Sequence, residues 1–438
     1  MIFPTRRAAA LLAAGAPLAL LGFVTPAAID AILVFDAILL ALVLIDGVFL
    51  TVPPRALHVE RRAPDAFSVG RPGEARYRWH NPKGGSARLS VREVLPEILG
   101  GPMAPRDLVV PARGERWETI SVTPVGRGRE TAGWLAVRSR GHLGLAHWQS
   151  RLTLPWRVTV YPALPASRLK ASIAEAARKR ETGLRPMRRL GEGRQFESLR
   201  EWVPGDDTRH IDWKATARRR KVIVRQYEEE RRQQVLLVLD AGRLLTAEVA
   251  GEPRMEYVVR AALWLAFAAN HHDDNVGVMV FADEVAHYVA PQRGRRGLRA
   301  LLDVLATVRP RLVESDYPAA FRYLAVRNRK RALTVFFTDV IDRLASEALV
   351  AHVGSLRPRH LPLVVTLRNP DLDRIADRPP GSVADAYRRA AAEELLAARD
   401  DALAEMRARG ALVLDVLPDQ AAGAVVDAYQ ELKRRGRL

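Results

Sequence analysis

Two aspartates are candidate functional residues, because each lies at the end of an apolar run that is as long as a buried strand. Asp240 ends the run VLLVLD, and Asp339 ends the run TVFFTD. Ser315 lies between them in the chain, in a loop that precedes a predicted helix. Carboxylate and hydroxyl oxygens suit a hard cation such as Mg²⁺. Asp240, Ser315 and Asp339 are therefore the candidate metal ligands.

The elements that would position these residues alternate between strand and helix over residues 233–438. Continuous apolar strands separated by helices indicate a mainly parallel sheet covered on both faces. Sites in such doubly wound α/β domains lie at the carboxyl ends of the strands, which would bring Asp240 and Asp339 to one edge. The strands are predicted within 233–241, 275–284, 287–291, 332–340, 360–367 and 411–418.

This arrangement resembles the von Willebrand factor A-like fold, and the resemblance implies a metal-dependent adhesion site. The family's first motif is Asp-x-Ser-x-Ser, whereas the stretch from Asp240 reads DAGRL and lacks both serines. The family's loop threonine falls at Ser315 and its last aspartate at Asp339. Arg243 could supply a positive charge in place of the ion. The resemblance therefore predicts a degenerate site without a cofactor, with Mg²⁺ as the open alternative.

A second segment, 191–232, is dense in charge. Its carboxylates alternate with basic residues around a PGDD turn, and this spacing permits bidentate Arg–carboxylate pairs that fix a folded loop. Apolar anchors, two of them Trp, favour a rigid insert over a solvated charge run. The candidate interaction or structural residues are Arg200, Glu201, Trp202, Pro204, Gly205, Asp206, Asp207, Arg209, Asp212, Trp213 and Arg218.

This run closely resembles the signature of the domain-of-unknown-function family 58. The regions on either side of this run also resemble the family. Its usual layout is a two-helix membrane anchor, a β-rich region and a C-terminal von Willebrand factor A-like domain. The resemblance also implies a partner. Family members are commonly encoded near MoxR-type AAA+ ATPases and are thought to work with them.

The N-terminus contains two apolar stretches, 8–24 and 27–50, with a turn signal at Thr25 and Pro26 between them. A spanning helix needs about 20 residues, and the first stretch only just qualifies. Arginines flank the pair on both sides and the turn has none, so the positive-inside rule places both ends in the cytoplasm. This predicts a two-pass protein of the inner (plasma) membrane with a cytoplasmic body. A cleaved signal peptide is the alternative, and it would put the body outside.

Three aspartates complicate the second apolar stretch, because acidic groups in hydrocarbon are costly and usually face protein or water. Asp36 lies near the middle of the stretch, with Asp30 and Asp46 toward its ends. Asp36 is either a helix-pairing contact or a protonated or locally hydrated group.

Residues 55–165 alternate polar and apolar positions between Gly, Pro and Asn, which indicates short antiparallel strands. The chain is therefore predicted to be multidomain. Its parts are a transmembrane helix hairpin (1–54), a small β-sandwich (55–165), a linker with the signature segment (166–232) and a doubly wound, von Willebrand factor A-like α/β domain (233–438).

The net charge of +18 favours an anionic partner, and the absence of Cys excludes disulfides and thiolate sites. Basic clusters at 218–221 and 293–299 allow a nucleic-acid-binding alternative. Aromatic residues make up only 6% and no reader motif occurs, so nucleic acid is not the expected partner. Anionic lipid at the membrane surface is the simpler partner for these cations.

The sequence predicts no enzyme. His210 lies among charged residues of the signature, where a structural role is the simpler interpretation than a general base. His271 and His272 are adjacent and therefore poor co-ligands. No phosphate-binding glycine motif occurs, so the chain should not hydrolyse ATP. The prediction is a non-enzymatic adaptor or scaffold that works with a MoxR-type ATPase in assembly or maturation of clients. A metal-dependent ligand-binding protein is the other alternative, and the oligomeric state stays open.

Overall fold

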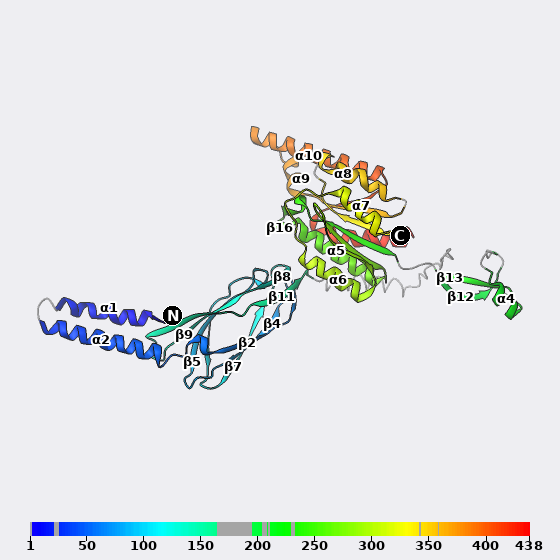
Figure 1. The fold of residues 1–438 in the computed structure, drawn as a ribbon. Helices are drawn as coiled ribbons and strands as arrows, with labels where there is room; N and C mark the ends of the chain where they lie inside the picture. Colours follow the sequence, from blue (N-terminus) through cyan, green and yellow to red (C-terminus); the bar gives the residue numbers. More distant parts are fainter. Residues whose placement is uncertain are drawn as a thin grey trace, which may run out of the picture. The chain divides into compact units, whose positions relative to one another are not determined.

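A computed structural model describes residues 2–21, 26–163, 195–203, 208, 211–228, 233–340, 343–357 and 359–438. The chain divides into two compact units, Met1–Ala163 and Leu164–Leu438 (Figure 1).

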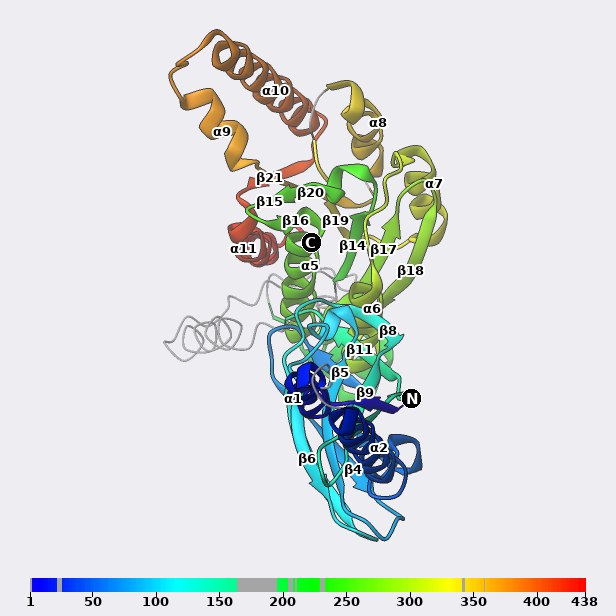
Figure 2. The ribbon, with the colours of Figure 1, turned by 90° about the vertical axis from the view of Figure 1, so that its left-hand side faces the viewer.

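The first unit contains two N-terminal helices, α1 (Arg6–Leu21) and α2 (Pro26–Val48), which lie side by side (Figures 1 and 2). Ile29–Val48 has a mean hydropathy of 2.5, and within the described residues it is the one helical segment long and apolar enough to cross a membrane. Its large apolar side chains are exposed around the helix, which suits contact with lipid. α1 has 16 residues, fewer than the about 20 that a span needs.

The rest of the first unit is built from strands, which confirms the β-rich region predicted over 55–165. One five-stranded sheet has the order β1-β10-β9-β5-β6, and two three-stranded sheets have the orders β2-β4-β7 and β3-β11-β8. The strands are β1 (Ile2–Pro4), β2 (His58–Arg62), β3 (Ala66–Ser68), β4 (Gly73–His80), β5 (Ala87–Val94), β6 (Arg106–Val110), β7 (Glu115–Val122), β8 (Gly128–Ala132), β9 (Trp134–Arg140), β10 (Ala146–Leu152) and β11 (Trp156–Tyr161).

Period-two alternation builds the core of this unit. In β4 and β5 every second residue is buried, so Tyr77, Trp79, Leu89 and Val91 meet in one apolar cluster. The sequence did not predict β1. This short strand pairs antiparallel with β10, with Ile2 opposite Trp148, and it therefore fixes the chain to the sheet just before α1 begins.

The second unit contains a six-stranded sheet of order β18-β17-β14-β19-β20-β21. Its neighbouring strands are parallel except β17 and β18, which are antiparallel. The α/β region predicted over 233–438 is therefore confirmed. The strands are β14 (Gln234–Asp240), β17 (Asn275–Phe281), β18 (Val285–Gln292), β19 (Leu333–Phe337), β20 (Leu361–Leu367) and β21 (Leu412–Val416).

Helices cover both faces of this sheet (Figure 1). Val235, Leu237 and Leu239 of β14 pack in one core with α5, α6 and α11, whereas Leu236 and Val238 pack in a second core with α7, α8 and α10. The helices are α5 (Arg254–His271), α6 (Gly294–Thr307), α7 (Tyr317–Arg327), α8 (Arg343–Val353), α9 (Pro370–Asp377), α10 (Val383–Ala408) and α11 (Ala421–Arg434), and β15 (Glu248–Val249) pairs with β16 (Glu252–Pro253) before α5.

The signature segment forms a small element of its own. β12 (Gln195–Glu201) and β13 (Ile223–Glu228) pair antiparallel, and α4 (Trp213–Arg219) lies between them in the chain.

Candidate functional site

Asp240 lies at the carboxyl end of β14, where hydrogen-bond donors surround its buried carboxylate. Its Oδ1 accepts from the hydroxyl of Ser315 and from the backbone N–H of Gly242 at 2.9 Å. Its Oδ2 accepts from the hydroxyls of Tyr317 and Thr338, each at 2.7 Å. Asp240 is 1% exposed, so protein donors take the place of water at both oxygens.

Gly242 makes the contact between Ser315 and Asp240 possible. A Cβ added at this glycine would lie 2.1 Å from the Ser315 hydroxyl oxygen, closer than any side chain tolerates. The metal motif to which the sequence was compared has a serine at this position. Here the position has no side chain, and the hydroxyl of Ser315 occupies the space.

Tyr317 is a neutral donor to this carboxylate. Burial, followed by the negative charge of Asp240, raises the pKa of the Tyr317 hydroxyl well above its usual range. The phenol therefore keeps its proton at physiological pH and continues to donate to Asp240.

Asp339 lies two residues beyond the end of β19 and has different partners. Arg399 of α10 donates from Nη1 to Asp339 Oδ1 at 2.9 Å, and Arg254 at the start of α5 forms an ion pair with Oδ2. Arg399 also donates from Nη2 to Asp415 Oδ1 at 2.7 Å and to the carbonyl of Leu367 at 3.1 Å. All three members of the central triad, Asp339, Arg254 and Arg399, are at most 9% exposed.

Arg254 stays charged in this cluster. Burial and the neighbouring charge of Arg399 lower the pKa of Arg254 to about 10, which is still well above neutral pH. Two guanidinium groups therefore face the Asp339 carboxylate, and Asp415 offsets part of their charge.

The predicted metal ligands do not fit a divalent cation in this geometry. The structure brings Ser315 onto Asp240, but the lone pairs of Asp240 are already occupied by donors, and two arginines hold Asp339. In the part of the chain that the structure describes, no group of three or more His, Asp and Glu could hold a metal ion.

The sequence suggested that Arg243 could supply a positive charge in place of the ion. Its half-exposed guanidinium forms an ion pair with exposed Glu314 instead. Arg254 and Arg399, which the sequence analysis did not single out, supply the charge from two helices.

A cavity of about 370 Å³ lies beside Asp339. Its lining mixes apolar side chains with charged ones, and the residues that line it include no Ser, Thr, Cys or His. The cavity therefore offers no nucleophile of these types and no imidazole base, but it can receive a side chain of mixed polar and apolar character. The apolar lining includes Leu244, Leu372, Leu395 and Leu396, and the charged lining includes Arg254, Arg368, Asp373, Arg399, Asp400 and Asp415.

The signature residues that the structure describes form a hairpin and a capped helix. Glu201 at the end of β12 forms an ion pair with Lys221 at 2.8 Å. Asp212 is the N-cap of α4, because its carboxylate accepts from the backbone N–H of Ala215 at 3.0 Å. Arg200 donates to the carbonyl of Glu201 at 3.1 Å. Pro204, Gly205, Asp206, Asp207, Arg209 and His210 lie outside the described residues.

The two tryptophans of the signature are on the surface. Trp213 is 70% exposed and Trp202 is 37% exposed. Both were expected to be apolar anchors of a rigid insert, and for Trp213 this is wrong. Ile223 and Val224 of β13 are the buried apolar residues instead. Exposed tryptophans are typical of a protein-binding surface.

The sheet order and its two helical layers define the second unit as a doubly wound α/β domain with one antiparallel edge strand. Residues 198–392, which run from β12 into α10, match the model of a family described as "Protein of unknown function DUF58". The resemblance inferred from the signature is confirmed over that range.

Three mycobacterial proteins are similar to the chain over 266 residues at 26% identity, which is 57% of this chain and 82% of each relative. They are the uncharacterized proteins Rv1480 and MT1527 of Mycobacterium tuberculosis and Mb1516 of Mycobacterium bovis.

Solved structures similar to parts of the chain include the CARDB domain of the PF1109 protein of Pyrococcus furiosus, described in complex with di-metal ions. It is 17% identical, covers 25% of this chain and 94% of its own, and has a TM-score of 0.17. A β-glucosidase from Listeria innocua is 12% identical, covers 25% of this chain and 16% of its own, and has a TM-score of 0.16. TM-scores this low do not show that the folds are related.

Proposed function

We propose that this protein is a membrane-anchored, non-enzymatic adaptor that works with a MoxR-type AAA+ ATPase in the assembly or maturation of client proteins. One observation carries the proposal. At the sheet edge where an α/β domain usually places its chemistry, internal donors and arginines already engage both aspartates. Binding of another protein is the activity that such a surface supports.

The second unit is, in this proposal, a von Willebrand factor A-like domain. Support comes from the sheet order, from the antiparallel edge strand β18 and from Asp240 at the end of the central strand β14. Arg254 and Arg399 would perform electrostatically what the ion does in metal-dependent members. Ligand binding by this domain would then need no metal.

The first unit is, in this proposal, a two-pass anchor with the soluble body in the cytoplasm. α2 has the length and composition of a span, and Arg6 and Arg7 are the first residues of α1. Cleavage of a signal peptide after α1 would remove β1 from the edge of the five-stranded sheet, where Ile2–Pro4 pair with β10. This pairing favours retention of the N-terminus over the signal-peptide alternative.

Co-purification tests the adaptor role. The detergent-solubilised full chain should retain a MoxR-type ATPase from the same cells, and Trp213→Ala should reduce the retained amount at least tenfold, by loss of a surface aromatic of the hot-spot type. Tyr387→Ala is the matched control, because Tyr387 is a 76% exposed aromatic on α10 of the same unit. Equal retention by both variants would exclude the signature as the docking surface, and no retention by the wild type would contradict the partnership.

A further inference from the structure

A row of basic side chains crosses the solvent-facing side of the five-stranded sheet. Arg88 of β5 lies directly opposite Arg140 of β9, and Arg140 lies opposite His147 of β10. Like charges that face each other across neighbouring strands are destabilising. The next row of the same face adds Arg138, opposite Gln149.

Nothing of opposite charge neutralises this row within the described residues. Arg88 and Arg140 form no ion pair there, and Arg138 donates only to the neutral amide of Gln149, at 3.2 Å. Burial, followed by the charges of Arg138 and Arg140, lowers the pKa of His147. The row therefore carries an uncompensated positive potential that a bound anion would relieve.

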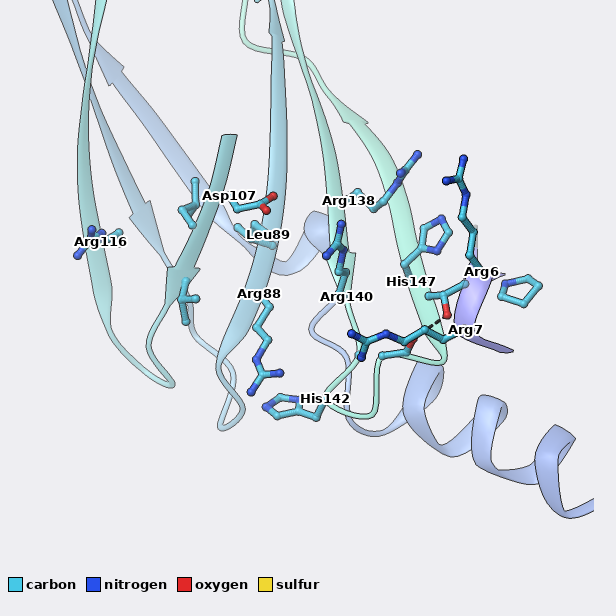
Figure 3. A pocket seen from close by; sticks show the side chains of 16 residues that line it. Arg6, Arg7, Arg88, Leu89, Asp107, Arg116, Arg138, Arg140, His142 and His147 are labelled. Carbon is cyan, nitrogen blue, oxygen red and sulfur yellow. Dashed lines mark hydrogen bonds between the residues drawn. The ribbon is translucent and has the colours of Figure 1, made fainter. Parts of the chain in front are cut away.

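These side chains line a cavity of about 1010 Å³ (Figure 3). Its lining contains six arginines and one carboxylate, that of Asp107. Figure 3 shows where these arginines lie, on β5, β7, β9 and the start of α1. The six are Arg6, Arg7, Arg88, Arg116, Arg138 and Arg140.

The cavity adjoins the end of the candidate membrane span. His142, which lines the cavity, donates from Nδ1 to the carbonyl of Leu50 at 2.7 Å, two residues after α2 ends at Val48. Thr5, which also lines the cavity, donates to the carbonyl of Gly144 at 2.6 Å, just before α1 begins. If α2 spans the bilayer, both contacts lie at the depth of the lipid headgroups.

We propose that this cavity binds the phosphate group of an anionic phospholipid headgroup. Guanidinium groups match phosphate oxygens with paired hydrogen bonds, and a phosphate between Arg88 and Arg140 removes their repulsion. The lipid is favoured over a soluble phosphate because the cavity adjoins the point where α2 leaves the hydrocarbon. The proposal rests on the membrane anchoring proposed above, but it does not depend on the partner ATPase.

Lipid binding to the full chain in a neutral detergent tests the proposal. The melting temperature is measured with phosphatidylglycerol, with phosphatidylcholine of the same acyl chains, with inorganic phosphate and with a short single-stranded RNA. Phosphatidylglycerol should raise the melting temperature of the wild type, and the apparent affinity should fall by about tenfold or more in the double variant Arg88→Gln/Arg140→Gln. The double variant Arg71→Gln/Arg157→Gln removes the same charge from exposed positions of this unit outside the cavity, and it should respond like the wild type.

Without lipid, Arg88→Gln/Arg140→Gln should melt at or above the wild-type temperature, because the variant loses a repulsion, and this result separates lost binding from lost folding. An unchanged phosphatidylglycerol response in this variant would overturn the proposal. Full stabilisation by inorganic phosphate, by phosphatidylcholine or by RNA alone would overturn the assignment to an anionic lipid. Release of the protein from membranes by alkaline carbonate would instead refute the anchoring, which is a separate outcome.

Discussion

The carboxylate of Asp46 accepts the backbone N–H of Leu145 at 2.8 Å, and this bond joins the end of α2 to the loop between β9 and β10. The same carboxylate accepts from the N–H groups of Leu143 at 2.9 Å and Ala146 at 3.0 Å, and it is fully buried. From the sequence, Asp46 was expected to be energetically unfavourable within an apolar stretch. In the structure three backbone N–H groups donate to it, so Asp46 connects the end of α2 to the loop between β9 and β10.

Substitution of Asp46 should therefore weaken the connection between α2 and the loop between β9 and β10. Asp46→Ala leaves three backbone N–H groups without their acceptor, and we expect a loss of about 3 kcal/mol in the free energy of unfolding of the first unit. Limited proteolysis of the full chain in detergent should show faster cleavage within residues 141–146. Asp36→Ala, in the same helix, is the control and should not change this cleavage. Identical protection in both variants would contradict the role of Asp46.

Arg399 should be one of the most sensitive positions of the second unit. Arg399→Ala removes the partner of two carboxylates and leaves the buried Asp339 with one arginine, so we expect a loss of about 3–5 kcal/mol in the free energy of unfolding. Arg388→Ala, on the exposed side of the same helix α10, should change it little. Denaturant unfolding measures both. Similar stability of the two variants would show that the buried cluster does not hold the sheet edge.

Divalent cations should bind weakly or not at all at the sheet edge. Two arginines oppose a cation at Asp339, and donors already occupy Asp240. Calorimetric titration of the wild type with Mg²⁺ or Mn²⁺ should give no saturating heat. Sub-micromolar binding that disappears in Asp240→Ala would restore the metal-dependent alternative.

Tyr317 should make stability depend on alkaline pH. Its folded pKa lies above the ordinary value of 10.0, so the protonated form is favoured in the folded state. The stabilisation is fully present below about pH 10 and is lost as the pH rises toward the folded pKa, because the unfolded chain then releases its proton more readily. Tyr317→Phe should be less stable than the wild type at pH 7 by about 1 kcal/mol and should lose less stability above pH 10. Parallel pH profiles of the two proteins would contradict this explanation.

Local patterns predicted the large elements. The alternation in ARLSVREV became β5, with every second side chain buried, and the unbroken apolar run ending at Asp240 became the central strand β14. β1 was not predictable in this way. It has three residues, which is too short to show a period-two pattern. Its pairing partner, Trp148, is far along the chain from Ile2, so the local sequence does not predict the strand.

The candidate site was predictable in part. Asp240 lies at the carboxyl end of β14, as the strand pattern implied, and Ser315 contacts it from the loop between α6 and α7. Arg399 carried a signal that was missed, since it stands in the buried stripe of α10 between Ala392 and Ala402, where a charge requires a partner. The exposure of Trp213 was not predictable, because a short polar segment does not reveal whether its apolar residues find a core.

The proposed placement of the soluble body, from about residue 55 onward, on the cytoplasmic side of the membrane is the central claim, and the absence of Cys allows a direct test. Single cysteines are introduced as Thr25→Cys in the predicted turn, Ser121→Cys on β7 and Ala390→Cys on α10, the last two at exposed positions. A membrane-impermeant maleimide added to intact cells with a permeable outer layer should label only Thr25→Cys, and the other two should react after the inner membrane is opened. Labelling of Ser121→Cys or Ala390→Cys in intact cells would contradict the account, because a cytoplasmic ATPase could not then reach the adaptor.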